Sequence, residues 1–250
     1  MTETFDNLYI VLTEPKNPGN IGASVRAMKN MGIPHLRLVN PVPFRDEDEQ
    51  KKMGYRSQDI VRNCREFPSL QEAVRDMSAV FITTSKQGKW RKDFLDVRDA
   101  AEQIAALMRN QKIAIVFGRE DKGVSIDESQ LANYLIYIPS AVHYPSLNLS
   151  QAVMVTVYEI YRAAAQNPVR KSLPVMATQH DFNRLEENIW DLMKTLEVRE
   201  GDNGKFHRSL KRTLSRTHWT RADIAVMDRA CKQIRWYLSH RVRPLTGSVE

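Results

Sequence analysis

Long apolar runs are missing from this 250-residue sequence. No stretch approaches the 18 residues that a membrane-spanning helix needs, and 27% of the residues are charged. The first residues lack the basic and apolar regions of a secretory signal peptide. Cysteine is scarce, since only Cys64 and Cys231 occur, far apart and without the spacing of a metal site. We therefore expect a cytoplasmic protein with two ordinary thiols, no membrane segment and no bound metal.

Glycine-rich phosphate loops are also absent. The loop after the first apolar run contains only Gly19 and Gly22, so it does not form the Gly-x-Gly-x-x-Gly signature of dinucleotide-binding proteins. An ordinary nucleotide-binding α/β protein is therefore disfavoured. Internal repeats and low-complexity tracts are missing as well.

Alternating strands and helices are predicted for the first two thirds of the chain. Short runs rich in β-branched and aromatic residues are typical of buried strands; they occupy residues 8–12, 35–39, 79–83, 113–117 and 134–138. Amphipathic helical spacing fills the intervals, and Asn20 and Ser69 are placed to cap two of these helices. The pattern predicts an α/β domain over residues 1–166, with a mostly parallel sheet covered by helices on both faces.

A small helical domain is predicted at the carboxyl end. Residues 167–174 form the only convincing linker, residues 175–243 have helical spacing, and residues 244–250 form a tail. Residues 205–243 contain 11 Lys and Arg against 2 Asp and Glu. Such an excess favours a polyanion such as nucleic acid, although a solvated helix face can also be basic.

Particular side chains of this basic domain are expected to contact nucleic-acid phosphates: Lys211, Arg212, Arg216 and Arg235. In the last helix we expect Ile234 to face inward and Arg235 to face outward. Trp219 and Trp236 could stack on an unpaired base, but their helical spacing favours core packing.

Three motifs, each in a loop that follows an expected strand, carry the chemistry. They are Asn20-Ile-Gly-Ala-Ser-Val-Arg26, Phe117-Gly-Arg-Glu-Asp-Lys-Gly123 and Ser146-Leu-Asn-Leu-Ser-Gln-Ala152. Ligands of open α/β sheets bind at the carboxyl ends of the strands, so we expect these loops to lie side by side around a pocket. Either glycine of the second motif could alone be a simple turn residue, but the whole set is more specific.

In this order and spacing the motifs resemble the SPOUT superfamily of RNA methyltransferases, in the branch that methylates ribose 2′-oxygens. The resemblance covers residues 8–165. The helical extension, with its basic run at residues 206–212, further resembles the bacterial tRNA (cytidine/uridine-2′-O)-methyltransferases that act at tRNA position 32. The resemblance therefore implies an enzyme that transfers a methyl group from S-adenosyl-L-methionine to a ribose 2′-oxygen of tRNA.

The resemblance also implies a fold detail and a cofactor site. The carboxyl end of the α/β domain would thread a trefoil knot built from residues 112–165, which no general folding rule proposes. The cofactor would lie among the loops after Thr83, Phe117 and Ile138. The matching cofactor-binding positions are Thr84, Ser85, Gly118, Ile138, Ser146 and Leu147.

Four residues match catalytic positions: Arg26, Asn20, Glu120 and Asn148. An arginine with a pKa above about 12 is a weak proton acceptor, so holding a phosphate and stabilising the developing alkoxide suits Arg26 better than the role of base. Glu120 would orient Arg26 or another loop group, or form a structural ion pair. Asn148 and Ser150 would touch the substrate or cap the last helix, and for Ser150 we favour the cap.

Family members are homodimers with shared active sites, so Arg26 and Asn20 would face the cofactor of one protomer, their own or the partner's. Apolar residues of the first and last helices of the α/β domain are expected at the dimer interface: Met28, Met31, Val157 and Tyr161. Two alternatives stay open. One is the same chemistry on another RNA such as ribosomal RNA, and the other is an RNA-binding module without catalysis.

Overall fold

The computed structural model describes residues 5–45, 47–85, 94–141, 147–166, 175–198, 204–215 and 219–241. The chain divides into two compact units, residues 1–179 and 180–250. The expected linker, residues 167–174, and the expected tail lie outside the described residues. The segment that follows the linker still packs on the first unit, because the Gln179 amide donates a hydrogen bond to the Met77 carbonyl at 3.0 Å.

The first unit contains a seven-stranded sheet within the described residues, in the order β3-β2-β1-β6-β4-β7-β5. All of its strand pairs are parallel. The strands are β1 (Leu8–Thr13), β2 (His35–Val39), β3 (Arg65–Phe67), β4 (Ala79–Thr83), β5 (Phe94–Asp96), β6 (Ile113–Phe117) and β7 (Tyr134–Tyr137). The α/β class is thus confirmed, whereas the short edge strands β3 and β5 were not predicted.

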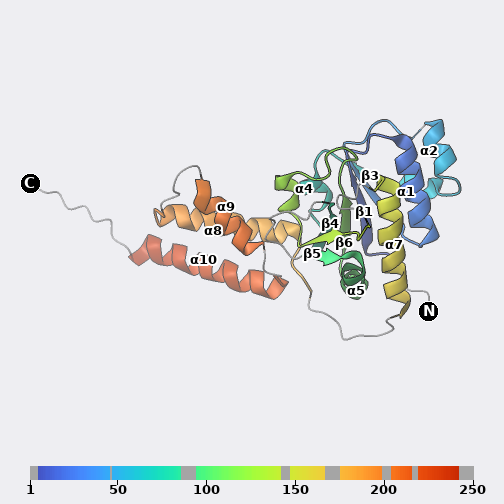
Figure 1. The fold of residues 1–250 in the computed structure, drawn as a ribbon. Coiled ribbons are helices and arrows are strands. Elements are labelled where there is room, and N and C mark those ends of the chain that lie inside the picture. The colour runs from blue at the N-terminus through green and yellow to red at the C-terminus, as the bar shows by residue number, and fades with distance from the viewer. Residues whose placement is uncertain are drawn as a thin grey trace, which may run out of the picture. The chain divides into compact units, whose positions relative to one another are not determined.

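Helices cover both faces of this sheet, as expected. Successive residues of β6 alternate between two cores: Ile115 packs with α1 (Pro18–Asn30), α5 (Val97–Leu107) and α7 (Leu149–Gln166), while Val116 packs with α4 (Leu70–Ala73). Figure 1 shows the sheet between α4 on one side and α1 and α7 on the other. The remaining helices of this unit are α2 (Asp48–Met53), α3 (Gln58–Asn63) and α6 (Ile126–Ser129).

The start of α1 differs from the expectation. Asn17 caps the helix, because its side chain accepts hydrogen bonds from the amides of Gly19 and Asn20. Pro18 occupies the first helical position, where its missing N–H costs nothing. The prediction that Asn20 is the cap is therefore wrong. The side chain of Asn20 is thereby released for contacts outside the helix.

A buried cation lies on the α4 side of the sheet. Arg37 of β2 is 4% exposed, and its guanidinium binds the Asp76 carboxylate through both terminal nitrogens, at 2.6 and 3.0 Å. Burial alone would raise the pKa of Asp76, but hydrogen bonds and charge from Arg37 outweigh it and lower the pKa to about 2. The α4 face is therefore joined to the sheet by a charged pair as well as by apolar packing.

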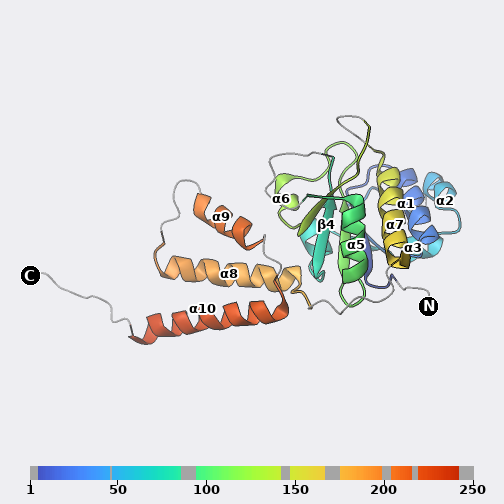
Figure 2. The ribbon, with the colours of Figure 1, turned by 60° about the horizontal axis from the view of Figure 1, so that its bottom comes forward.

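The second unit is helical in its described part, with α8 (Gln179–Thr195), α9 (Lys205–Leu214) and α10 (Arg221–Arg241). Figure 2 shows α8 lying between α9 and α10. As predicted, Thr220 caps α10, where its hydroxyl accepts from the Asp223 amide at 3.1 Å. Apolar side chains buried between these helices include Leu185, Ile189, Leu192, Ile224 and Cys231.

Two orientations in α10 are the reverse of the prediction. Ile234 is 41% exposed. Arg235 is half-buried and donates a hydrogen bond to the Asn188 carbonyl of α8 at 2.7 Å. The physical reason is that a carbonyl of α8 satisfies the guanidinium, so the charged residue can lie at the helix contact. Among the residues described, no helix is long and apolar enough to cross a membrane.

Candidate active site

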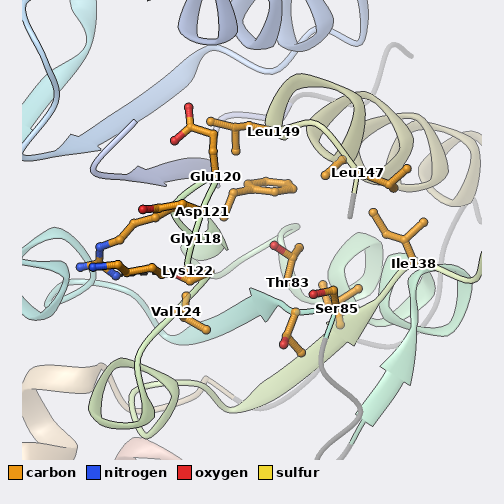
Figure 3. Close-up of a pocket in the computed structure, with 16 residues that line it drawn as sticks. Thr83, Ser85, Gly118, Glu120, Asp121, Lys122, Val124, Ile138, Leu147 and Leu149 are labelled. Atoms are coloured by element: carbon orange, nitrogen blue, oxygen red, sulfur yellow. Dashed lines mark hydrogen bonds between the residues drawn. The ribbon is translucent and has the colours of Figure 1, made fainter. Parts of the chain in front are cut away.

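The three sequence motifs meet at the carboxyl end of the sheet. Loops after β4, β6 and β7, together with the start of α7, surround a cavity of about 200 Å³. In Figure 3, Ile138 and Leu147 lie on one side of this cavity, opposite Lys122 and Val124. We had expected the loops after β6 and β7 to be neighbours, but β4 lies between these two strands in the sheet. The β4 loop therefore forms the middle of the pocket.

The predicted cofactor positions converge on this cavity. Thr84, Ser85, Gly118, Ile138 and Leu147 all line it. Ser146 lies outside the described residues. The lining combines apolar side chains from β7 and α7 with hydroxyl groups from the β4 loop and carboxylates from the β6 loop, the mixture that small-molecule sites have. That these residues bind the cofactor stays a prediction.

The β6 loop has a fixed and unusually tight shape. Arg119 and Gly123 exchange two backbone hydrogen bonds, at 3.1 and 2.9 Å. A Cβ on Gly118 would lie only 2.4 Å from the carbonyl carbon of Gly123, a distance that backbone atoms cannot relieve. Gly123 itself has a φ of +67°, which favours glycine. Both glycines are therefore required by the loop, whatever else they do.

Arg119 anchors this loop, and sequence reasoning missed it. Its guanidinium donates to both oxygens of Glu14 and to both oxygens of Glu128. These hydrogen bonds raise the pKa of Arg119, and those from Arg119 hold the pKa of Glu14 below its usual value. The only signal in the sequence was the basic residue inside the second motif, because Glu14 lies 105 residues away along the chain.

A chain of polar side chains joins the three motifs. Asn20 donates a hydrogen bond to the Glu120 carboxylate at 3.2 Å, and Asn148 donates to the Asn20 side-chain oxygen at 2.9 Å. Glu120 also accepts from the backbone amide of Lys16 at 3.2 Å. Of the roles considered for Glu120, the structure therefore favours orientation of a loop group. The ion pair is made by its neighbour Asp121, which contacts the Lys16 ammonium at 2.7 Å.

Asn148 also begins α7. Its side-chain oxygen accepts from the Ser150 amide at 2.9 Å, and its carbonyl accepts from the Ala152 amide at 2.9 Å. Asn148 is thus the cap of α7, and the preference for Ser150 as the cap is wrong. One side chain both starts the helix and reaches Asn20, which fixes the third motif against the first.

Arg26 lies apart from this chain. It follows Asn20 by six residues, which places it about 9 Å further along α1 and about 120° around the helix. Its side chain is exposed, it does not line the cavity, and it has no ion pair or hydrogen bond among the residues described. The structure therefore does not bring Arg26 to the pocket of its own chain.

The expected RNA-binding residues differ in their surroundings. Arg212 is exposed on α9, whereas the Lys211 ammonium lies 3.8 Å from the buried carboxylate of Glu186. Arg235 contacts the α8 backbone, as described above. Arg216 lies outside the described residues. Their role in RNA binding stays a prediction, and only Arg212 among the described three is both exposed and without a protein partner.

The two tryptophans separate into different classes. The Trp219 indole is partly buried and donates a hydrogen bond to the Leu214 carbonyl at 2.8 Å, so it packs within the unit as expected. Trp236 is 48% exposed and stacks on His240, with ring centroids 5.0 Å apart. The expectation that Trp236 packs in the core is therefore wrong.

Comparison with known proteins gives the family. Residues 7–158 match the SpoU rRNA Methylase family, a stretch that contains all three motifs and every strand of the sheet. The chain belongs to the SpoU methylase family. The resemblance stated from the motifs is thus confirmed, and with it the prediction of a methyltransferase.

The similarity of this SpoU-family chain to its relatives extends beyond the α/β unit. An uncharacterized tRNA/rRNA methyltransferase of Haemophilus influenzae is 33% identical over 89% of this chain and 92% of its own length. The tRNA (cytidine/uridine-2′-O-)-methyltransferase TrmJ of Pectobacterium atrosepticum is 30% identical over 84% of this chain and 89% of its own. The crystal structure of TrmJ from Z. mobilis ZM4 superposes with a TM-score of 0.78 at 24% identity, covering 91% of this chain and 98% of that one. The fold of the helical unit is therefore shared with a solved structure.

Proposed function

We propose that this SpoU-family protein transfers a methyl group from S-adenosyl-L-methionine to a ribose 2′-oxygen of tRNA, at the pyrimidine of position 32. The observation that carries the proposal is the hydrogen-bonded chain Glu120–Asn20–Asn148 beside the cavity. It joins three motifs from distant parts of the sequence at one edge of the sheet. A TrmJ relative that aligns over both units supports tRNA as the substrate class.

The cavity residues fit the proposed cofactor by their chemistry. Ile138 and Leu147 offer an apolar edge for a purine, and Leu147 is 40% exposed. Thr84 and Ser85 offer hydroxyl groups for the polar parts of the ligand, and Glu120, whose carboxylate is held by Asn20 and the Lys16 amide, also lines the cavity. When bound, S-adenosyl-L-methionine supplies an electrophilic methyl group.

The chain's own residues would position the acceptor. Glu120 and Asn148 hold Asn20 from both sides, so the Asn20 carboxamide is fixed before RNA arrives, and preorganisation of this kind lowers the barrier of an in-line displacement. Arg26 would bind the RNA phosphate next to the reacting ribose and stabilise the alkoxide that develops on the 2′-oxygen.

The position of Arg26 supports a homodimer in which this residue serves the partner's pocket. The neighbouring helix α7 exposes apolar side chains at helical spacing: Met154, Tyr158 and Tyr161 are 36%, 45% and 46% exposed. Met28 and Val157, which we expected at the interface, are fully buried within the chain itself. The predicted interface therefore keeps Tyr161 and the partly buried Met31, and gains Met154 and Tyr158 in place of those two.

Mass mapping of ribose methylation tests this function. Total tRNA from cells with and without the protein is digested and compared, and purified protein is then offered the same tRNA with S-adenosyl-L-methionine. We expect one additional 2′-O-methylated pyrimidine at position 32. Methylation elsewhere in tRNA would correct the position, and methylation of ribosomal RNA alone would overturn the tRNA assignment.

A non-catalytic RNA-binding module is separated by a second measurement. Calorimetric titration with S-adenosyl-L-methionine is expected to show binding at a single site per chain. A protein that binds tRNA but neither binds the cofactor nor methylates any RNA would overturn the proposal. A Gly118→Ala variant is the matched control for the calorimetry. Its added Cβ collides with the Gly123 backbone and deforms the pocket loop, so cofactor binding should be lost.

A further inference from the structure

One face of α10 carries a row of cations that ends in an aromatic pair. Arg221, Arg229, Lys232, Trp236 and His240 fall within an arc of about 100° on the helix surface and extend about 28 Å along its axis. We call these five residues the α10 stripe. Residues that pack against α8, such as Ile224 and Arg235, lie outside this arc, so the stripe is separate from the helix contact.

The cationic end of the stripe lies in a groove. Arg221, Arg229 and Lys232 line a cavity of about 680 Å³ between α8 and α10, together with Arg184 and two carboxylates. Those carboxylates, Asp181 and Asp228, lie 3.9 and 3.2 Å from the Arg184 guanidinium. Four cations against two carboxylates leave a charge of +2 in the groove. Arg229 and Lys232 have no acidic partner among the described residues, so the groove favours an anion.

The aromatic end of the stripe is solvent-accessible. Trp236 is 48% exposed although its indole stacks on His240, and the imidazole Nδ1 lies 2.9 Å from the Trp236 carbonyl. An indole ring held against a second ring is already restricted before any ligand binds, so little side-chain freedom is lost on stacking a further ring. Lys232, one helical turn earlier, keeps a cation beside this surface.

We propose that the α10 stripe binds a single-stranded segment of RNA, with backbone phosphates on Arg229 and Lys232 and an unpaired base stacked on Trp236. The inference rests on the proposed function, because it assigns the contact with unpaired nucleotides of the tRNA. Cations that follow a backbone and an adjacent aromatic ring are the two components that single-stranded sites combine. None of the stripe cations is among the residues predicted from the sequence to bind phosphates, and base stacking was considered there for Trp236, with core packing favoured instead.

The arrangement favours unpaired RNA over the other possible occupants. A duplex hides its bases from stacking, so it would use the cations and leave Trp236 without a role. A second copy of this chain carries a net charge of +7, so its approach to a groove of charge +2 is electrostatically disfavoured. The exposed apolar residues Val226, Tyr237 and Ile234 lie about 40°, 60° and 120° beyond His240 around α10, so they do not form the surface of the stripe.

Binding measurements with two matched RNAs test the proposal. Full-length protein is titrated with a stem-loop and with a blunt duplex of equal phosphate count. Trp236→Ala is expected to weaken stem-loop binding about 10-fold or more and to leave duplex binding unchanged. Trp236→Phe should recover most of the affinity, because a phenyl ring also stacks. Arg229→Gln with Lys232→Gln should weaken both RNAs and lower the stem-loop salt slope by about 1.4.

Tyr237→Ala is the control. Tyr237 is 56% exposed on the same helix, next in sequence to Trp236 but about 100° away around the axis. We expect its loss to leave binding of both RNAs unchanged. Tryptophan fluorescence gives a second readout: the stem-loop should quench emission in the wild type and much less in Trp236→Phe, which retains three of the four tryptophans.

Three outcomes would overturn the proposal: equal losses for Trp236→Ala and Tyr237→Ala, equal losses for stem-loop and duplex, or a change of oligomeric state in Trp236→Ala by light scattering. Circular dichroism verifies that each variant keeps its helices. These measurements need no methyl transfer. Failure of the stripe therefore remains distinct from failure of the proposed enzymatic function, which would appear as wild-type protein that binds RNA without methylating it.

Discussion

The two units of the chain differ in how deeply their side chains are buried and in which contacts hold them together. In the α/β unit, strands such as β6 are buried over their whole length, and the pocket loops project from that rigid sheet. In the helical unit, charged and polar contacts lie directly between the helices. The buried carboxylate of Glu186 binds His207 at 2.6 Å, and Arg235 binds an α8 carbonyl. Few side chains of α9 and α10 are fully buried.

This difference indicates how methyl transfer and RNA binding are divided between the two units. A transferred methyl group demands positioning to within fractions of an ångström, which a sheet buried on both faces provides. Attraction of a polyanion requires exposed charge. A unit with a small core can present such charge, because phosphate contacts depend less on exact geometry. Variants that affect one unit and spare the other therefore test whether chemistry and RNA anchoring are separate.

The largest effect is expected from Arg26→Ala. Loss of a guanidinium that stabilises the developing alkoxide should lower kcat by about 100- to 1000-fold. Affinity for S-adenosyl-L-methionine should stay the same, because Arg26 does not line the cavity. Single-turnover methylation and calorimetry measure the two quantities separately.

Arg26→Lys gives the matched control for charge. An ammonium cannot bind a phosphate through two parallel hydrogen bonds, so rescue should be poor. If Arg26→Ala instead abolished cofactor binding, Arg26 would belong to the cofactor site and its assignment to the RNA phosphate and the alkoxide would be wrong.

The second effect concerns stability of the helical unit. Leu185 is fully buried in α8, and Leu185→Ala should destabilise this unit by about 2–5 kcal/mol. Because so few side chains are buried there, the helical unit should unfold before the α/β unit, giving two thermal transitions by circular dichroism. Cofactor binding should survive while tRNA binding is lost.

An equally buried residue of the sheet serves as the comparison. Phe81→Ala, which removes a fully buried ring from β4, should instead lower the transition of the α/β unit and abolish cofactor binding. A single cooperative transition in both variants would show that the two units are stabilised together.

The third effect separates two basic residues that the sequence treats alike. Arg212→Gln should lower the salt slope of tRNA binding by about 0.7–0.9 without changing stability, because this residue is exposed. Arg235→Gln should lower stability of the helical unit by about 1–2 kcal/mol, through loss of the hydrogen bond to the Asn188 carbonyl, with an unchanged salt slope. Salt-dependent binding and thermal unfolding of both variants distinguish a phosphate contact from a structural one.

The sequence predicts the architecture well where burial leaves a local pattern. The five apolar strands and α7 were found because their residues are buried over runs long enough to recognise. β3 and β5, of three residues each, carry no such pattern. The start of α1 was placed at Asn20 instead of Asn17, although proline, here Pro18, is suited to the first position of a helix.

Contacts between distant residues could not be predicted in the same way. The three motifs converge as expected, because strand ends in a parallel sheet share one edge. The partners of Arg119 and the cap role of Asn148 depend on which loops meet, and periodicity contains no information about that. The same limit explains Trp236: helical spacing places it on a face of α10, but only the packing of α8 decides which face is buried.

The smallest effect concerns acid stability of the α/β unit. The pKa of Asp76 is lowered from its ordinary value of 3.8 to about 2, so its pairing with Arg37 stabilises the fold fully above pH 3.8. That contribution is lost as the pH falls through about 2, because the protonated carboxyl no longer pairs with the guanidinium. The Asp76 side chain is 45% exposed, so screening by water reduces the contribution to about 1 kcal/mol.

Asp76→Asn should therefore have lower stability at neutral pH and a flatter stability curve between pH 4 and 2. Denaturant unfolding across this range, with Asp48→Asn on the exposed surface of α2 as the control, measures both features. Equal slopes in the wild type and Asp76→Asn would mean that other carboxylates determine the stability of the fold in acid. If the helical unit unfolded at a higher pH than the α/β unit, the helical unit would limit the acid stability of the chain.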